Sequence, residues 1–293
     1  MQERPFNVFC ATAISASGNP DSNRPRHDMN ITTMQQQNLT TPSLARSSIS
    51  DLPAEKIIGA PRSLPLADLP PFPAYESLRN LNPQNTPDRN NVLLIIPTAN
   101  SQKTRILLKA FSPPPTGGKL HHLVVPADSG VGEQPYDDAG LQGAHNRIAN
   151  ALLQTLTSSP LKLDALLAEK KIGTVMAASI ENYIQRQRQR PDGGVDVGAR
   201  PADYGVVMVH NATTGETAAV VSAGVTVPRE YLEYARSFGF EEGDEMHGRV
   251  TVGYVLAANV PGLDLANWHA VVVGRSRYDL LEEAIEEGLR IPW

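Results

Sequence analysis

A short polar turn between an expected strand and an expected helix carries the first residues that could do chemistry. The apolar run in "NVLLIIPTANSQKTRILLKAF" predicts a strand over 92–98 that is buried on both faces. A helix follows, with Ser101 as its expected N-cap. A helix N-terminus attracts anions, and a lysine beside it adds a full positive charge. The turn therefore predicts either a phosphate site or an ordinary connection with a solvated lysine. The candidate phosphate ligands are Thr98, Asn100, Ser101 and Lys103.

A glycine-rich acidic loop is the second candidate. In "PADSGVGEQPYDDAGLQGAHNRIANALL" the chain passes from the end of a strand through this loop into a long helix. Mg²⁺ prefers carboxylate and phosphate oxygens, so Asp137 and Asp138 beside a phosphate pocket are candidate metal ligands. Gly140 and Gly143 would let the backbone approach a ligand closely. The alternative is that the two aspartates only cap the helix.

Single polar residues near other expected elements complete the candidate set. Glu181 falls at the carboxyl end of an apolar strand, the edge at which open α/β sheets bind ligands, although a lone acid there can also be simply solvated. His269 enters an apolar run and is more typical of a hydrogen-bonded structural histidine than of a catalytic base. Arg275 and Arg277 flank a helix cap and could face a ligand.

The elements that must position these residues form one expected α/β domain with a mixed sheet, over 89–293. Ser276 and Asp279 form a capping pattern, and "NATTGETAA" predicts a hairpin turn. The expected strands are 92–98, 121–126, 174–181, 204–212, 217–223 and 269–273. The expected helices are 101–111, 140–157, 228–238, 250–258 and 276–288.

Residues 1–88 differ in composition from the rest of the chain. They are rich in Pro, Ser and Asn and nearly lack a periodic apolar pattern, so they bury too little surface to offset the cost of ordering. We therefore expect a disordered arm that precedes the domain. Within it, "LPLADLPPFPAY" is either a polyproline II segment for a protein partner or a plain linker.

Composition excludes several classes of protein. A net charge of -5 and a pI near 5.8 argue against a nucleic-acid binder. The single cysteine, Cys10, allows no internal disulfide, and no apolar run is long enough to span a membrane. The first residues make a poor signal peptide, so we expect a cytoplasmic protein. The sequence lacks the motifs of P-loop proteins, zinc metalloproteases and α/β-hydrolases.

Several ordered motifs carry a family resemblance over about 90–290. "SGVGEQPY…GAHNRIANA" resembles a segment of the inosine/xanthosine triphosphatases, and "PTANSQK" and "SIENYI" resemble their phosphate turn and their I-E-A-G-I segment. The segments "AGLQGA", "VTVGYVL", "NWH" and "GRSR" are similar to the C-terminal domain of the proline-rich coiled-coil protein family, which also has a proline-rich arm. The resemblance implies an inosine-triphosphatase-like fold.

The two families imply different functions. The triphosphatases hydrolyse ITP and XTP with a divalent metal and form homodimers. The proline-rich family is implied to bind protein kinase A regulatory subunits and to act in Golgi-linked trafficking. This chain departs from the triphosphatase pattern at Ser101, at Tyr183 and at Ala139-Gly140, where that pattern has an acidic residue and a threonine.

If the chain is an enzyme, the resemblance assigns roles to its residues. Thr98, Asn100, Ser101 and Lys103 would hold the triphosphate of a purine nucleotide. Glu181, with Asp137 or Asp138, would hold Mg²⁺ (or Mn²⁺), Arg147 and Arg277 would contact other phosphate oxygens, and Glu181 and Lys103 would be catalytic. The alternatives are an inactive binding module, Golgi-associated in that case, or a pocket for another small phosphorylated metabolite.

Overall fold

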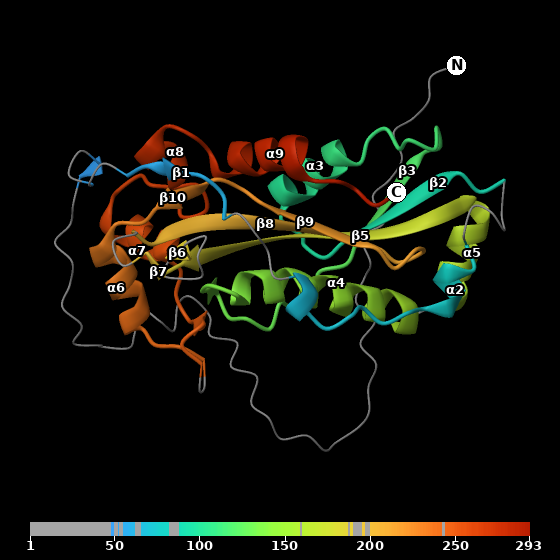
Figure 1. Cartoon of the computed structure of the whole chain (residues 1–293), viewed down its shortest axis with the longest axis horizontal. Helices are drawn as coiled ribbons and strands as arrows, with labels where there is room; N and C mark the ends of the chain where they lie inside the picture. Colours follow the sequence, from blue (N-terminus) through green and yellow to red (C-terminus); the bar gives the residue numbers. More distant parts are fainter. Residues whose placement is uncertain are drawn as a thin grey trace. The chain divides into compact units, whose positions relative to one another are not determined.

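The structure is a computed structural model that describes residues 48–49, 52, 55–61, 66–81, 88–158, 160–186, 188–189, 195–196, 200–241 and 244–293. Within these residues the chain has a mixed α/β architecture, with helices on both faces of a mixed sheet (Figure 1). The expected fold class is confirmed at this level. None of the described helices is long and apolar enough to cross a bilayer.

The central sheet has seven strands in the described part of the chain, in the order β1-β10-β8-β5-β2-β3, with β9 also paired to β8. Strands β3, β2 and β5 run parallel, and the remaining pairs are antiparallel. The expected hairpin is confirmed, because β8 and β9 pair directly across it. The strands are β1 (Ile57–Ile58), β2 (Asn91–Ile96), β3 (Leu120–Val124), β5 (Ile172–Gln185), β8 (Ala202–Asn211), β9 (Thr217–Val221) and β10 (Gly224–Thr226).

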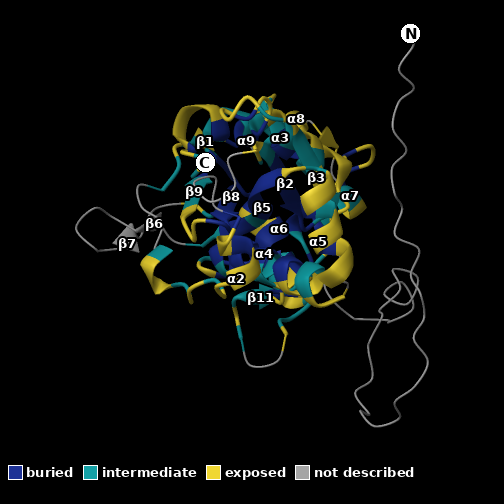
Figure 2. Ribbon diagram, turned by 90° about the vertical axis from the view of Figure 1, so that its right-hand side faces the viewer, coloured by how far each residue is buried: buried dark blue, intermediate teal, exposed yellow. Residues whose placement is uncertain are grey.

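Two helical layers enclose this sheet. Helix α4 (Ala139–Ser158) covers one face, and α3 (Ser101–Ala110) and α9 (Arg277–Gly288) cover the other (Figure 1). The buried residues gather in the strands between them (Figure 2). The other helices are η2 (Leu66–Asp68), α2 (Glu76–Arg79), α5 (Pro160–Glu169), α6 (Arg229–Ser237), α7 (Val252–Asn259) and α8 (His269–Val273). The short strand pairs are β4 (Gln134–Pro135) with β11 (His247–Gly248), and β6 (Arg188–Gln189) with β7 (Val195–Asp196).

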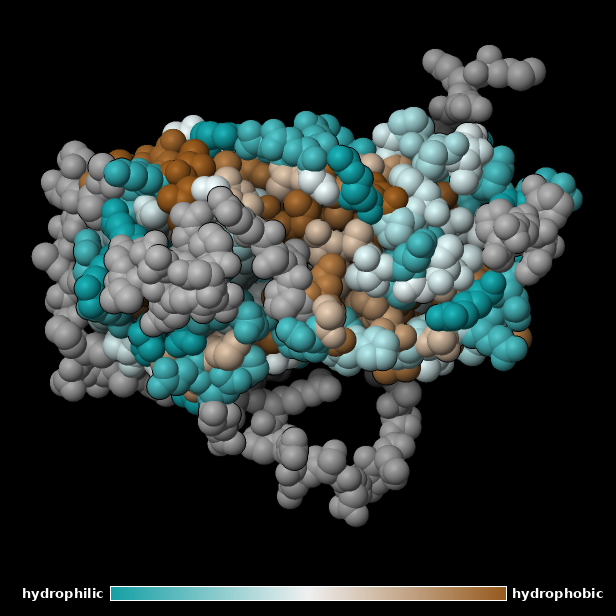
Figure 3. All heavy atoms as spheres, in the orientation of Figure 1, coloured by the Kyte–Doolittle hydropathy of each residue, from teal (hydrophilic) through white to brown (hydrophobic). Residues whose placement is uncertain are grey.

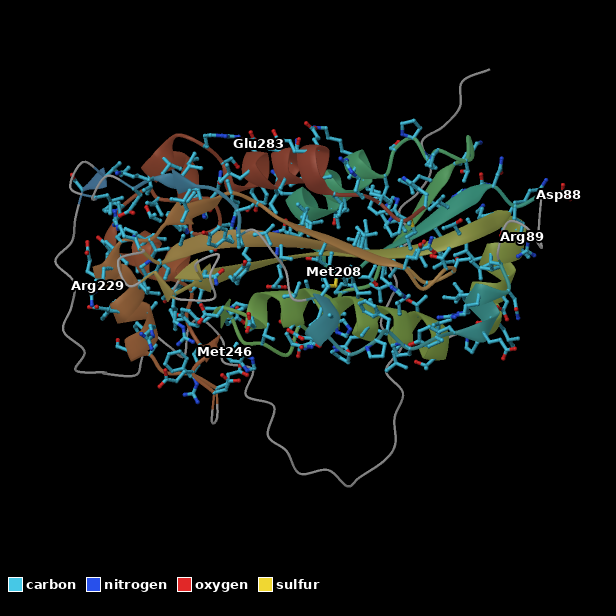
Figure 4. The ribbon with its side chains drawn as sticks, viewed as in Figure 1. Asp88, Arg89, Met208, Arg229, Met246 and Glu283 are labelled. Atoms are coloured by element: carbon cyan, nitrogen blue, oxygen red, sulfur yellow. The ribbon has the colours of Figure 1, made fainter. Side chains whose placement is uncertain are left out.

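The alternation of side chains along β5 divides the core into two halves. Val175 and Ala177 pack in the half that faces α4, whereas Met176 and Ala178 pack in the half that faces α3 and α9. Met208 of β8, labelled in Figure 4, belongs to the α4 half and is fully buried. Because both faces are covered, β2, β5 and β8 are apolar along nearly their whole length.

Three local expectations are wrong. The expected strand 269–273 is the short helix α8, which ends at Gly274 with a φ of 70°. Its β-branched valines favour a strand locally, but the tertiary fold overrides that preference. Helix α5 is missing from the expected helices, and the N-cap of α3 is Asn100 rather than Ser101. The capping box at Ser276 and Asp279 is confirmed.

The domain begins earlier than the expected boundary at residue 89. Strand β1 pairs with β10, and Leu78 and Leu81 are buried in the core beside α4. The described parts of 55–81 therefore belong to the domain rather than to a disordered arm. The residues of the expected arm that lie outside the described residues are 1–47, 50–51, 53–54, 62–65 and 82–87.

The segment 66–75 packs on the domain through Leu66, Leu69, Phe72 and Tyr75. The Phe72 ring lies 4.2 Å from the ring of His145 on α4 and 4.2 Å from that of His210 on β8. His210 is only 4% exposed, and burial lowers its pKa to about 4. The described part of the expected polyproline segment, residues 66–75, is thus packed on the fold.

Acidification is expected to destabilise the protein through His210. Its pKa is about 4 in the folded chain, against an ordinary 6.5, so the unfolded chain binds the proton more readily. The free energy of unfolding falls as the pH drops from 6.5 toward 4, by about 1 to 2 kcal/mol between pH 7 and pH 5 from this group. Urea unfolding of the native chain and of His210→Gln at both pH values measures the difference. An equal pH dependence in both would contradict the assignment.

Candidate functional site

A cavity of about 180 Å³ lies at an open edge of β5. Strand β2 pairs with β5 as far as Ala177, and the next bridge on that edge joins Ile184 to Tyr136. The stretch between these two pairings faces the cavity. The polar residues of its wall include Lys103, Gln134, Glu181, Asn182, Asp203 and Arg277, and Leu265 and Trp268 are among its apolar residues.

Lys103 reaches this cavity from the first turn of α3. Its Nζ donates a hydrogen bond of 2.8 Å to the carbonyl oxygen of Ile180. Within the described part of the chain, no carboxylate lies within ion-pair distance of this ammonium. Lys103 is half-buried as a residue, but its ammonium is enclosed, and burial lowers its pKa to about 8 while Glu181 opposes the shift. An enclosed cation without an ionic partner suits an anionic ligand.

Glu181 lies on the α4 side of the sheet and is already paired. Arg147 of α4 donates from Nε to its Oε2 at 2.5 Å and from a terminal nitrogen to the carbonyl of Ala127 at 2.7 Å. Only 7% of Glu181 is exposed. The structure therefore brings the predicted residues Lys103, Glu181 and Arg147 into one cluster, but it gives the carboxylate an arginine partner.

A buried polar cluster forms the opposite wall. Oδ2 of Asp203 lies 2.7 Å from Nε2 of His269 and accepts a hydrogen bond of 3.0 Å from Arg277. Burial alone would raise the pKa of Asp203, but Arg277 and His269 outweigh that effect, and the pKa is lowered. His269 is thus the hydrogen-bonded structural histidine that the sequence predicts. Asp203 is a residue that sequence reasoning missed, and its only signal is a charge at the start of an apolar strand.

The other predicted phosphate ligands stabilise the start of α3. Oδ1 of Asn100 accepts hydrogen bonds of 3.0 Å from the backbone N–H groups of Gln102 and Lys103, and Oγ1 of Thr98 accepts one of 3.1 Å from Asn100. Ser101 is exposed in the first turn. None of Thr98, Asn100 and Ser101 is among the described residues of the cavity wall. Thr98 and Asn100 thus cap the helix whose first turn carries Lys103.

The predicted metal ligands do not come together. Asp137 accepts two hydrogen bonds from Arg186, of 2.8 Å from its backbone N–H and 2.6 Å from its Nε. Asp138 is exposed, and neither aspartate is part of the described cavity wall. Among the described residues, no group of three His, Cys, Asp or Glu side chains is placed to hold a metal ion. Helix α4 begins directly after these aspartates.

Gly140 approaches a side chain of the protein rather than a ligand. A Cβ atom at Gly140 would lie 2.3 Å from Cγ of Tyr183. The Tyr183 side chain is 5% exposed and stacks on Tyr204 at a ring distance of 5.8 Å. The two departures from the triphosphatase pattern, at Ala139-Gly140 and at Tyr183, are therefore one packing arrangement. Gly143 similarly admits Val131 and lets α4 lie close to Glu181.

Comparison with known proteins assigns no family to the chain. No protein-family model matches it, and no curated protein matches it significantly. Among solved structures, the crystal structure of protein VC0702 from Vibrio cholerae is similar, with 17% sequence identity and a TM-score of 0.45, over 66% of this chain and 90% of that chain. A likeness at this level identifies neither the fold family nor the function.

Proposed function

We propose that the chain binds a phosphorylated small molecule, with a purine nucleoside triphosphate as the first candidate, in the cavity beside β5. The supporting observation is the enclosed ammonium of Lys103, which has one hydrogen bond, to Ile180, and no carboxylate at ion-pair distance among the described residues. An ammonium group has three N–H donors, so two remain for phosphate oxygens. A bound phosphate would also raise the lowered pKa of this lysine.

Several charged side chains surround Lys103. Those that act on its pKa are Glu181, Asp203, Arg147 and Arg277, and Glu133 is a further carboxylate of the cavity wall. Counting Lys103 itself, three cations are matched by three carboxylates, so the site has no excess of positive charge. Because Arg147 is bound to Glu181 and Arg277 to Asp203, Lys103 is the cation of this set that has no carboxylate partner among the described residues. An anionic ligand is therefore favoured by Lys103 and not by the net charge.

Hydrolysis of ITP or XTP with Mg²⁺, which the family resemblance implies, is the second candidate. The proximity of Glu181 to Lys103 favours it. The residues present do not fit the metal, because Glu181 is bound to Arg147 and Asp137 to Arg186. We therefore derive no metal-dependent step. The same two ion pairs favour the inactive binding module, which would bind the phosphorylated ligand without hydrolysing it.

Calorimetric titration of the full chain with ITP, XTP, GTP and ATP tests ligand binding. Lys103→Met is expected to weaken binding roughly 10- to 100-fold, because charge-assisted hydrogen bonds contribute about 1.5 to 3 kcal/mol. Lys109→Met is the matched control, since Lys109 lies on the same helix, is exposed and pairs with Glu282 and Glu286. Equal affinity of the Lys103→Met variant and the native chain would overturn the proposal.

Phosphate release from the same nucleotides, with Mg²⁺ and with EDTA, separates the two candidates. Release that needs the metal and is lost in Glu181→Gln would assign hydrolysis. Binding without release would assign the inactive binding module. If the chain neither binds these nucleotides nor releases phosphate from them, both candidates are overturned.

A further inference from the structure

A second cavity, of about 230 Å³, lies under the proline-rich segment 66–75. The segment runs along α4 toward α2 (Figure 1). It is held by the Phe72 ring between the rings of His145 and His210, and by a contact of 2.8 Å between Nε2 of His145 and the carbonyl oxygen of Pro70. Pro71 and Pro73, on either side of Phe72, are exposed. Leu66, Leu69 and Tyr75 of the segment also pack against the core, and Phe72 is the side chain that lies between the two histidine rings.

The segment fills its groove incompletely. The cavity remains open between the segment and a floor that includes His145, His210, Ala212 and Thr217. The cavity is open to solvent, so a ligand that filled it would replace water by dispersion contacts with its walls. The face that carries this segment also exposes apolar side chains between the hydrophilic outer surfaces of the two helical layers (Figure 3).

An unpaired polar atom lies in one residue of the groove floor. Nε2 of His145 faces the carbonyl oxygen of Pro70 and donates its proton to it. Nδ1 of the same ring has no hydrogen-bond partner among the described residues, but it is buried and is not exposed to the groove. What segment 66–75 leaves unused is therefore the volume of the groove.

We propose that this groove is a docking site for a proline-rich segment of a partner protein, with an aromatic side chain between prolines, and that residues 66–75 occupy it in cis. The chemistry of the occupant follows from the segment already seated there, Pro-Pro-Phe-Pro. Proline fixes φ before binding, so a proline-rich segment loses little conformational entropy when it docks. A tethered ligand acts at an effective concentration of roughly millimolar, so only a ligand that fills the groove better displaces it.

Fluorescence anisotropy with labelled peptides tests this proposal on the full chain. The probe is the ten-residue peptide LADLPPFPAY, which copies residues 66–75, and the control peptide has alanine in place of its phenylalanine. Phe72→Ala removes the aromatic anchor of the tethered segment without altering the groove floor. This variant is expected to bind the probe at least tenfold more tightly than the native chain does, and to bind the control peptide no better than the native chain.

Two further measurements keep the proposal falsifiable. If Phe72→Ala does not fold, the probe at millimolar concentration should still shift the imidazole NMR signals of His145 and His210 in the native chain. Absence of these shifts, or equal binding of both peptides by a folded variant, would overturn the proposal. Sedimentation compares the oligomeric state of the native chain with that of Phe72→Ala. We expect no dimer of the native chain that disappears in the variant. Such a dimer would identify a second copy of the chain as the occupant and would also overturn it.

Discussion

Replacing Asp203 with alanine is expected to lower the free energy of unfolding by about 3 to 5 kcal/mol. The variant would leave the Arg277 guanidinium, 18% exposed, without its carboxylate partner. It would also remove the carboxylate that lies 2.7 Å from His269, a side chain that is 2% exposed. An uncompensated buried charge is expensive because it cannot recover the hydration that it had in the unfolded chain. Urea unfolding at pH 7, with an unchanged m-value, measures the loss.

A surface ion pair supplies the control for this prediction. Glu283 pairs with Arg275 at 2.9 Å, but the two side chains are 43% and 41% exposed. Pairs of this kind contribute about 0 to 1 kcal/mol, so Glu283→Ala should change stability only slightly. A loss below about 1 kcal/mol in Asp203→Ala would mean that Arg277 finds water or another partner, and that Asp203 does not hold the cluster together.

The strands were the part of the fold that the sequence predicted best. Continuous apolar runs such as "VLLII" and "YGVVMVHNA" favour a strand covered on both faces, and the structure confirms it for these two. Short helices were predicted less well. In α8 the valines favour extended backbone, and only the surrounding fold, with Trp268 buried against His269, makes the segment helical. Such tertiary effects leave no local pattern to recognise.

The cation of the candidate site could be predicted from the sequence. The partners of the carboxylates near it could not. Lys103 lies in the first turn of α3, where ligand-binding residues recur, so its position alone identifies it. Glu181 was expected at the carboxyl end of its strand, but β5 continues to Gln185 and Glu181 lies inside it. The partner of each carboxylate depends on contacts between distant segments. Arg147 and Glu181 are separated by 34 residues, and Asp203 and His269 by 66. A cluster of carboxylates in the sequence therefore predicts a metal site only if no arginine from another element reaches it.

Substituting Gly140 with alanine is expected to destabilise the protein by about 3 kcal/mol. Gly140 lies in the first turn of α4, where alanine would otherwise be favoured by up to about 1 kcal/mol. Packing opposes that gain, because the new Cβ would lie 2.3 Å from Cγ and 2.5 Å from Cβ of Tyr183. The contact to Tyr183 Cβ cannot be relieved by rotating the ring, so the strand or the helix must move.

Whether Gly140→Ala lowers or raises the free energy of unfolding tests the packing of Gly140 against Tyr183. Gly59→Ala is the control, since a Cβ at Gly59 meets no heavy atom within 4 Å and should leave stability nearly unchanged. Introducing Gly140→Ala into a Tyr183→Gly background should restore the gain from helix propensity, because the clashing side chain is gone. A stabilised Gly140→Ala single variant would show that α4 shifts freely against β5. Since α4 carries Arg147 and β5 carries Glu181, that freedom would also mean that their ion pair is not held in one geometry beside Lys103.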